Sequence, residues 1–170
     1  HALLRLLTET EKPVVTAING AAVGAGFSLA LAGDVIVARD DAWFAAAFPK
    51  VGALPDLGIL HHLPRAIGLA RAKDLLMTNR RVEAAEALNM GMVSRVLPAA
   101  DFDAAVLKIA TQLAEGPTVS LGLSKALMNA GLNDFLPKES LAQATVFSTQ
   151  DFAEGIAAFQ EKCSPRFVGK

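Results

Sequence analysis

Short apolar runs separated by glycine or proline dominate the first hundred residues. Four of these runs are rich in β-branched or aromatic side chains, and each predicts a strand: 14–18, 35–38, 43–45 and 92–97. The first two runs show little alternation of polar and apolar positions, which is typical of strands buried on both faces. Because helices are expected between the strands, the pattern favours right-handed parallel connections.

Helical spacing of apolar residues predicts the other elements of this half. Residues 2–11 have leucines at positions 3, 4, 6 and 7, which indicates a short amphipathic helix. An apolar, alanine-rich helix at 27–32 is expected to end with Gly33 as its C-terminal cap. Further helices are expected at 57–60, 67–77 and 82–88, and Leu63-Pro64 should end the first of these three.

Beyond residue 100 the spacing of apolar residues is helical throughout. The expected helices cover 101–115, 118–129, 137–150 and 151–162. Glycine or Gly-Pro separates the first three, and Asp151 is a suitable N-cap for the last. The pattern therefore predicts an α/β region followed by an all-helical region.

Composition narrows the classes of partner. The chain has 170 residues, 52% of them hydrophobic, which is enough for one domain with a sizeable core. A net charge of −1 offers no general attraction to nucleic acid or to an anionic membrane. The uncharged run from Pro13 to Gly33 is long enough to span a membrane, but Asn19-Gly20 and three later glycines argue against one continuous helix. Neither nucleic acid nor membrane is expected as a partner.

The cysteine and histidine content excludes two kinds of site. Cys163 is the single cysteine, so the chain has no internal disulfide, which fits a reducing compartment such as the cytoplasm. His61 and His62 are adjacent and do not have the spacing of a metal pair or a nucleophilic triad. No metal site is predicted, and core or surface packing is the expected role of both histidines.

The turn Gly24-Ala25-Gly26 carries the clearest chemical potential. It precedes a helix, whose first N–H groups are unpaired and electropositive, and small residues allow an acyl group to approach the backbone. Such a turn suits an oxygen that becomes negative during a reaction. It does not match a dinucleotide fingerprint, since the third glycine position holds Leu29. A turn that only packs a helix on a sheet remains the alternative.

The motifs around this turn resemble one family. Lys-Pro-Val-x-x-Ala-x-Asn-Gly at 12–20 is followed by Gly-x-Gly at 24–26 and Leu-Ala-x-x-Gly-Asp at 29–34. The resemblance continues through three later segments, at 63–68, 84–93 and 164–167. Together these motifs resemble the crotonase (enoyl-CoA hydratase/isomerase) superfamily over essentially the whole chain. The spacing of aromatic, glycine and Pro-Asp residues at 44–56 is most similar to the epoxyphenylacetyl-CoA isomerases of phenylacetate degradation.

The resemblance implies an α/β, crotonase-like ββα spiral followed by a helical trimerisation region. Residues 1–98 would form part of the spiral core and carry the oxyanion turn and Asp56, and residues 99–170 the C-terminal helical region. Several strands, the first oxyanion N–H and much of the CoA-binding loop would come from a part N-terminal to His1. A homotrimer or a hexamer is expected.

The resemblance also implies roles for individual residues. The N–H of Ala25 would be the second oxyanion donor to the thioester carbonyl, with acyl-CoA contacts expected from Ala22, Gly24, Gly26, Phe44, Phe48 and Leu54. The two glutamates of the family's hydratases correspond to Ser28 and Phe48 here, so standard hydration lacks both carboxylates.

Asp56 lies where isomerases and dehalogenases of the superfamily carry a catalytic aspartate. Its neighbours Leu54, Pro55 and Leu57 should desolvate the carboxyl and raise its pKa toward that of a useful base. The alternative is an ordinary helix N-cap, which Pro-Asp before an apolar run also predicts. Phe147, Phe152 and Phe159 are expected in the core, although the resemblance allows one or two of them to close the acyl site of a neighbouring subunit.

These observations predict an acyl-CoA isomerase in which an oxyanion hole stabilises a thioester enolate and Asp56 moves one proton. Coenzyme A would be part of the substrate, and no separate cofactor is expected. Two alternatives stay open: an enoyl-CoA hydratase, and a catalytically silent subunit that binds acyl-CoA.

Overall fold

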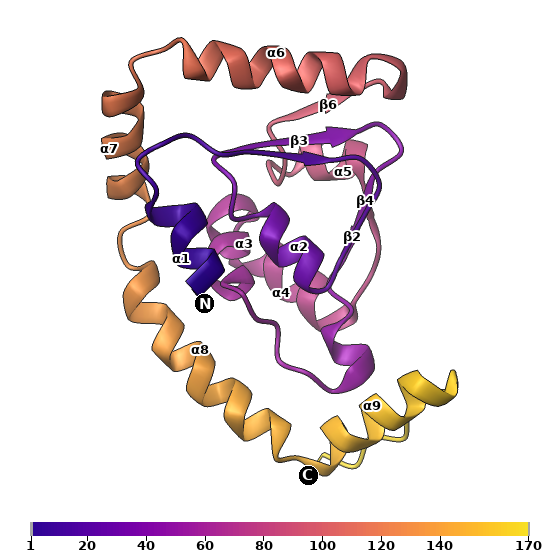
Figure 1. Cartoon of the computed structure of the whole chain (residues 1–170). Coiled ribbons are helices and arrows are strands. Elements are labelled where there is room, and N and C mark those ends of the chain that lie inside the picture. Colours follow the sequence, from indigo (N-terminus) through magenta and orange to yellow (C-terminus); the bar gives the residue numbers. More distant parts are fainter. Residues whose placement is uncertain (1, 170) are drawn as a thin grey trace.

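Two small sheets form the centre of the molecule in the computed structural model, which describes residues 2–169. In the first sheet, β3 (Val35–Arg39) lies between β1 (Val15–Ile18) and β6 (Arg95–Leu97), and all three strands are parallel. In the second sheet, β4 (Trp43–Ala45) pairs parallel with β2 (Ala21–Val23) and antiparallel with β5 (Val82–Glu83). The chain passes from the first sheet to the second at Asn19-Gly20, returns to the first for β3, and passes to the second again between β3 and β4 (Figure 1).

Three details of the strand prediction are corrected. The expected turn at 19–20 is followed directly by β2, and the first residues of the expected helix at 82–88 form β5. Both strands are short, and their pairing with β4 creates them rather than their own weak pattern. β1 is not buried on both faces, because Ala17 is exposed and only Ile18 of this strand is buried.

Four short helices pack between and beside the sheets: α2 (Ala25–Ala30), α3 (Ile59–Ile67), α4 (Leu69–Thr78) and α5 (Ala84–Asn89). A 3₁₀ turn, η1 (Phe48–Val51), leads to the loop before α3. The largest fully buried side chains of the main core come from these helices and from the second sheet, and they include Phe27, Phe44, Ile59, Leu63, Leu75 and Val82.

Pro64 and Gly33 do not act as predicted. α3 continues through Pro64 to Ile67, since Leu63 and Ile67 are buried and their packing outweighs the one lost backbone donor. The break falls instead at Gly68, whose φ of 83° separates α3 from α4. Gly33 is not a left-handed cap; a Cβ there would lie 2.5 Å from the Thr16 hydroxyl, so close packing explains the glycine.

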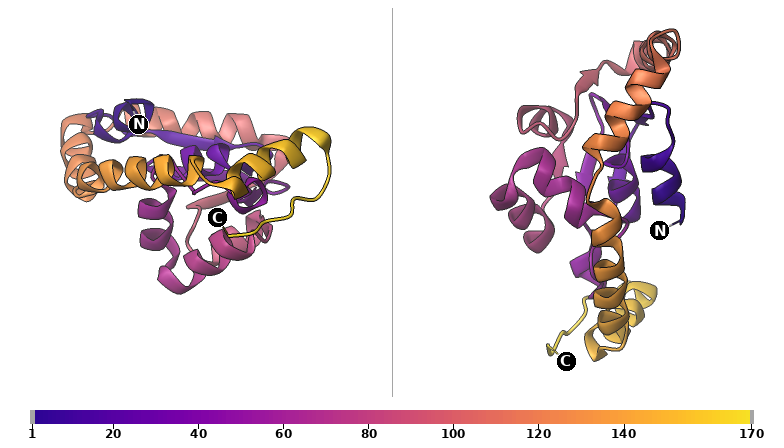
Figure 2. Two further views of the ribbon diagram at one scale, coloured as in Figure 1. Left: turned by 90° about the horizontal axis from the view of Figure 1, so that it is seen from below. Right: turned by 90° about the vertical axis from the view of Figure 1, so that its left-hand side faces the viewer.

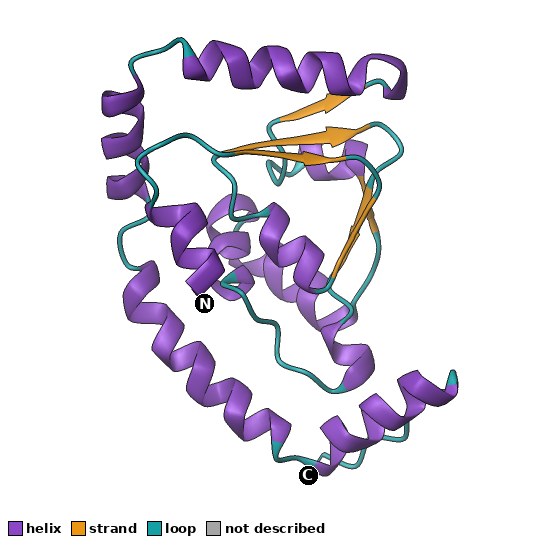
Figure 3. Cartoon of the chain, in the orientation of Figure 1, coloured by secondary structure: helices purple, strands orange, loops and turns teal. Residues whose placement is uncertain are grey.

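The C-terminal half is an arc of helices around the sheets (Figures 1 and 3). The arc consists of α6 (Phe102–Ala114), α7 (Thr118–Met128), α8 (Leu132–Phe147) and α9 (Gln150–Glu161), with a short 3₁₀ turn, η2 (Ala99–Asp101), before it. α6 packs on β1, α7 on the N-terminal helix α1 (Ala2–Glu9), and α9 on η1. In Figure 2 α1 and α4 lie on opposite sides of this arc.

Two helix boundaries in the arc differ from the prediction. α8 begins at Leu132, five residues before the expected start, because Leu132 and Leu136 fill a small core with Leu4 and Ala32. Pro137 therefore lies inside α8. The N-cap of α9 is Thr149, whose hydroxyl accepts the Phe152 N–H at 3.1 Å, and not Asp151.

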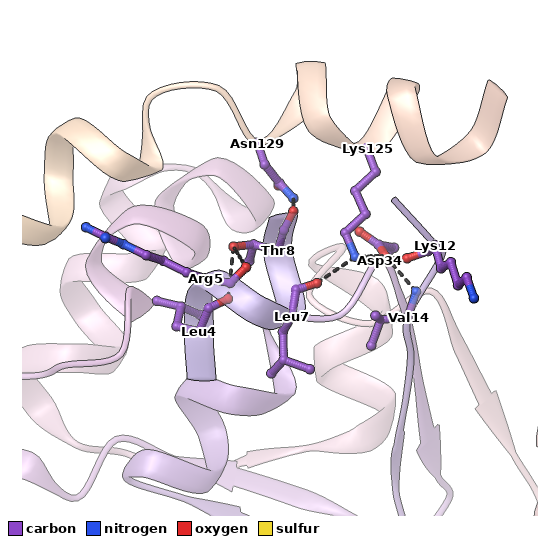
Figure 4. A network of polar contacts seen from close by, with 9 residues as sticks. All are labelled: Leu4, Arg5, Leu7, Thr8, Lys12, Val14, Asp34, Lys125 and Asn129. Atoms are coloured by element: carbon purple, nitrogen blue, oxygen red, sulfur yellow. Dashed lines mark hydrogen bonds and ion pairs between the residues drawn. The ribbon is translucent and has the colours of Figure 1, made fainter. Parts of the chain in front are cut away.

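A buried lysine fastens the arc to the spiral core (Figure 4). Lys125 on α7 is 3% exposed, and its ammonium donates to the carbonyls of Leu7 at 2.6 Å and Lys12 at 3.1 Å. The same ammonium lies 3.0 Å from the carboxylate of Asp34, which also accepts the Val14 N–H. This network gives the buried charge a full set of partners, and it holds α7 against both α1 and the start of β1.

Residues 2–169 contain no helix long and apolar enough to cross a membrane. The same described residues contain no cluster of three or more histidine, cysteine or acidic side chains that could hold a metal ion.

Candidate active site

The glycine turn is built as a backbone feature of the second sheet. Gly24 has φ 55° and ψ −122°, a conformation open almost only to glycine, and its N–H donates to Ala45 O at the end of β4 at 3.0 Å. Ala25 is the first residue of α2, so its N–H has no acceptor within the helix. Its φ is not positive, and alanine is therefore compatible with this position. Ala25 and Gly26 are both exposed.

Ser28 supports the turn from inside the helix. Its side chain is fully buried, and its backbone N–H and hydroxyl lie 3.1 and 3.5 Å from the carbonyl oxygen of Gly24. A hydroxyl committed to the turn cannot replace the carboxylate that a hydratase of the family would carry there.

Beside the turn lies an apolar cavity of about 360 Å³ between α1, α2 and the first two strands. Ala22 and Gly26 line it, together with Leu3, Leu7, Leu29 and the backbone around Asn19-Gly20. Two of the predicted substrate contacts thus line a cavity next to the glycine turn.

The predicted aromatic contacts lie deeper. Phe44 is fully buried and packs against Phe27 with ring centroids 5.5 Å apart, and Phe48 is 8% exposed. Both belong to the main core below the glycine turn. Their part in lining an acyl pocket stays a prediction, and the structure gives them a packing role.

Asp56 lies in the loop 52–58 between η1 and α3, and α3 packs on α2. The N-cap interpretation is wrong, because α3 begins at Ile59 after Gly58 and no side chain caps it. One oxygen of the Asp56 carboxyl, Oδ1, is buried without a hydrogen-bond partner in the described part of the chain. As expected from its neighbours, burial raises the pKa of Asp56. Leu54 is half-buried in the same loop.

A second cavity, of about 420 Å³, opens at Asp56. Asp56 and Leu57 form one wall and α8 forms the other, with Glu139, Ser140, Gln143, Ala144 and Phe147. The Oε1 atom of Gln143 is also buried without a partner in the described residues. Phe147 is 52% exposed rather than in the core, and Phe159 is 72% exposed. The predicted base therefore faces a cavity with an apolar end.

Glu139 is a site residue that the sequence analysis missed. Its carboxylate is 3% exposed and accepts the Gly58 N–H, with Oε2 at 3.0 Å and Oε1 at 3.3 Å. Burial raises the pKa of Glu139, and the charge of Asp56 raises it further. A signal was present: Glu139 continues the buried stripe of Leu132 and Leu136 at helical spacing. The expected helix started too late to show it.

Two histidines lie behind the Asp56 loop, on α3. His61 Nδ1 is 2.7 Å from the Arg65 guanidinium, and the His61 and His62 rings meet edge to face. Burial, His61 and Arg65 lower the pKa of His62 to about 4. The His62 Nε2 atom has no partner in the described residues. Neither histidine lines the cavities described above, in line with the packing role expected for them.

The structure thus presents a backbone donor at Ala25, beside the cavity of α1 and α2, and a half-buried carboxyl at Asp56, which lines a separate cavity against α8. The chain matches the family model of enoyl-CoA hydratase/isomerase over residues 1–170. A probable enoyl-CoA hydratase of Rhodobacter capsulatus is 38% identical over 99% of this chain and 67% of its own length. The 1,2-epoxyphenylacetyl-CoA isomerase of Escherichia coli is 38% identical over all of this chain and 66% of its own.

Solved structures agree with these relatives. The crystal structure of an enoyl-CoA hydratase from Mycobacterium avium subsp. paratuberculosis superposes with a TM-score of 0.92 at 38% identity, covering 98% of this chain and 69% of that one. The chain spans about two thirds of the length of the curated relatives that it matches. It has the crotonase fold, and it belongs to the enoyl-CoA hydratase/isomerase family within the crotonase superfamily.

Proposed function

We propose that the protein is an acyl-CoA isomerase in which Asp56 moves a proton between two carbons of the acyl group. The observation that carries this is the Asp56 carboxyl, which faces a cavity with one oxygen buried and without a partner in the described residues. Burial raises its pKa and so favours proton uptake near neutral pH. Ser28 and Phe48 stand where a hydratase needs carboxylates.

The reaction is a proton relocation and needs no added water. Asp56 removes a proton from carbon, the electron pair moves into the thioester as an enolate, and the enolate oxygen is held by the Ala25 N–H and a second donor. The same carboxyl then returns the proton to a different carbon. Coenzyme A enters as part of the substrate, and the proposed reaction uses no further cofactor. The similarity to the 1,2-epoxyphenylacetyl-CoA isomerase of E. coli supports an acyl group of the phenylacetate type as the substrate of this protein.

Replacement of Asp56 by asparagine tests the proposal. Asn keeps the size of the side chain but cannot act as a base, so isomerisation, and exchange of acyl-CoA carbon-bound protons in deuterated water, should fall by roughly two to four orders of magnitude. The complete protein is the one to assay, because the oxyanion hole needs a second donor. Parental rates in a folded Asp56→Asn variant would exclude Asp56 as the base.

Hydration of an enoyl-CoA is the second candidate. The similarity to the probable enoyl-CoA hydratase of Rhodobacter capsulatus supports it. Glu139 supports it as well, because it places a second carboxyl at the Asp56 cavity although Ser28 and Phe48 carry none. Formation of a 3-hydroxyacyl-CoA from an enoyl-CoA, lost in the Asp56 or Glu139 variants, would favour this alternative. Binding of acyl-CoA with no turnover at all would favour a silent subunit.

We also propose a homotrimer or a hexamer. The helices of the arc expose many large apolar side chains, among them Leu107, Val119, Leu123, Leu127, Met128, Leu141 and Phe159. Such a surface is costly in water and suits contact between subunits. A monomer in light scattering at micromolar concentration would contradict this assembly for the complete protein.

A further inference from the structure

Glu139 has an unusual position for an acidic side chain. It lies near the middle of α8 and is 3% exposed, although a buried carboxylate is expensive unless it is well bonded. It accepts the N–H of Gly58, 81 residues earlier in the chain, with both carboxylate oxygens within 3.3 Å of that nitrogen. Hydrogen bonds from Gly58 and Leu57 act against the effect of burial on its pKa. The carboxylate is therefore held by backbone amides of the loop that carries Asp56.

The loop has a backbone conformation that needs such support. Leu57 has φ 52° and Gly58 has φ 74°, so two successive residues are left-handed directly after Asp56. For leucine this conformation costs roughly 1–3 kcal/mol and persists only where the surroundings hold it. Successive amides in such a turn form a concave donor site that suits an anion. Glu139 occupies that place.

We propose that Glu139 is a positioning residue for Asp56: by accepting the Gly58 N–H it holds the left-handed turn at 57–58, and the turn directs the Asp56 carboxyl into the cavity. The inference rests on the proposed role of Asp56 as the base. Because α8 belongs to the helical arc, the docking of the arc then decides whether the base is aligned.

A role for Glu139 as a second proton carrier fits the contacts less well. Both of its oxygens lie within 3.3 Å of the Gly58 nitrogen, so the carboxyl is bonded to the turn. Since burial and the nearby Asp56 charge both favour the protonated form of Glu139, a neutral glutamine is a close substitute for it. A positioning role therefore predicts that Glu139→Gln keeps activity, whereas a proton carrier would lose it.

The test compares three variants of the complete protein: Glu139→Met, Glu139→Gln and Lys138→Ala. Methionine keeps the length and buried character of the side chain without a strong acceptor, and the exposed neighbour Lys138 is the control. The readouts are hydrogen exchange of the Gly58 amide by NMR, and kcat and KM for isomerisation. In Glu139→Met, Gly58 exchange should rise at least about tenfold and kcat should fall roughly 10–100-fold with KM within about threefold. Glu139→Gln and Lys138→Ala should stay within about threefold of the parent in both.

Each other outcome overturns part of the proposal. Unchanged Gly58 exchange in Glu139→Met would show that Glu139 does not hold the turn. Faster exchange with parental kcat would remove the positioning role, and loss of kcat in Glu139→Gln with protected Gly58 would make Glu139 a proton carrier. If the parent catalyses no isomerisation, the proposed function fails, while Gly58 exchange still decides whether Glu139 holds the turn. Should Glu139→Met not fold, Glu139→Ala provides the same comparison.

Discussion

The glycine turn at 24–26 and the loop 52–58 supply the two halves of the proposed site, and they are built differently. The turn is held from within the spiral core: Gly24 bonds to Ala45 at the end of the paired strand β4, and Ser28 bonds to Gly24 four residues back. The loop is held from far away, since Gly58 bonds to Glu139 on α8 and a Cβ at Gly52 would meet the backbone of Asp151 on α9 at 2.7 Å. The proposed oxyanion donor thus depends on the spiral core, whereas the proposed base depends on the helical arc.

Among changes to the glycine turn, Ala25→Pro is expected to have the largest effect on kcat. Ala25 is the first residue of α2, where proline fits the backbone, so the variant should fold while losing the oxyanion N–H. Loss of one such donor should reduce kcat by about a hundredfold or more. Ala25→Ser, which keeps the N–H, is the matched control and should retain parental kcat. Full activity of a folded Ala25→Pro variant on every acyl-CoA that the parent accepts would refute the assignment.

Acid should lower the free energy of unfolding through His62, which lies on α3 next to the Asp56 loop. The pKa of His62 is lowered to about 4 in the fold, against 6.5 in an unfolded chain, so the unfolded state binds more protons between these values. The stability from neutral His62 is complete above pH 6.5 and is lost as the pH falls toward 4, by about 3 kcal/mol in total.

Urea unfolding of the parent and of His62→Gln from pH 7 to pH 4.5 measures this contribution. The raised pKa values of Asp56 and Glu139 act in the opposite direction, but they are common to both proteins. The difference between the two curves isolates His62, and parallel curves would mean that His62 does not titrate as described.

A pair of glycine substitutions sharpens the comparison between the two regions. In Gly58→Ala the φ of 74° strains the backbone and the new Cβ would lie 2.9 Å from Leu4, so a loss of roughly 1–3 kcal/mol is expected. In Gly26→Ala nothing lies within 4 Å and the helix gains a better former, so the stability should stay equal or rise by up to about 1 kcal/mol. Chemical unfolding measures both, and equal losses would contradict the contrast.

The smallest expected effect is a gain in stability from Asp56→Asn. The parent buries a carboxyl oxygen without a partner in the described residues, near Glu139, and a neutral amide removes that electrostatic cost. The free energy of unfolding at pH 7 should rise by about 0.5 kcal/mol, as is common where activity opposes stability. Because the pKa of Asp56 is raised above its ordinary value of 3.8 in the fold, the gain should shrink as the pH falls through that raised pKa and should be absent below 3.8. A loss of stability at pH 7 would indicate a structural role for the carboxylate.

The sequence by itself determined the elements whose signals are local. The strands at 15–18, 35–39 and 43–45, the glycine turn and most helices of the arc follow from runs of β-branched residues, from helical spacing and from glycine. The raised pKa of Asp56 also followed from its apolar neighbours in the chain. Family membership followed from motifs that extend along the whole chain.

Only the tertiary structure decided the rest, because the deciding contacts join residues far apart. β2 and β5 exist through pairing with β4, and α3 continues through Pro64 because its apolar face is buried. α8 starts at Leu132 to complete a small core with Leu4. The support of the Asp56 loop by Glu139 joins two segments 81 residues apart, and no local pattern fixes which carboxylate meets which amide. Local spacing specifies elements, but packing in three dimensions determines which side chains share a site.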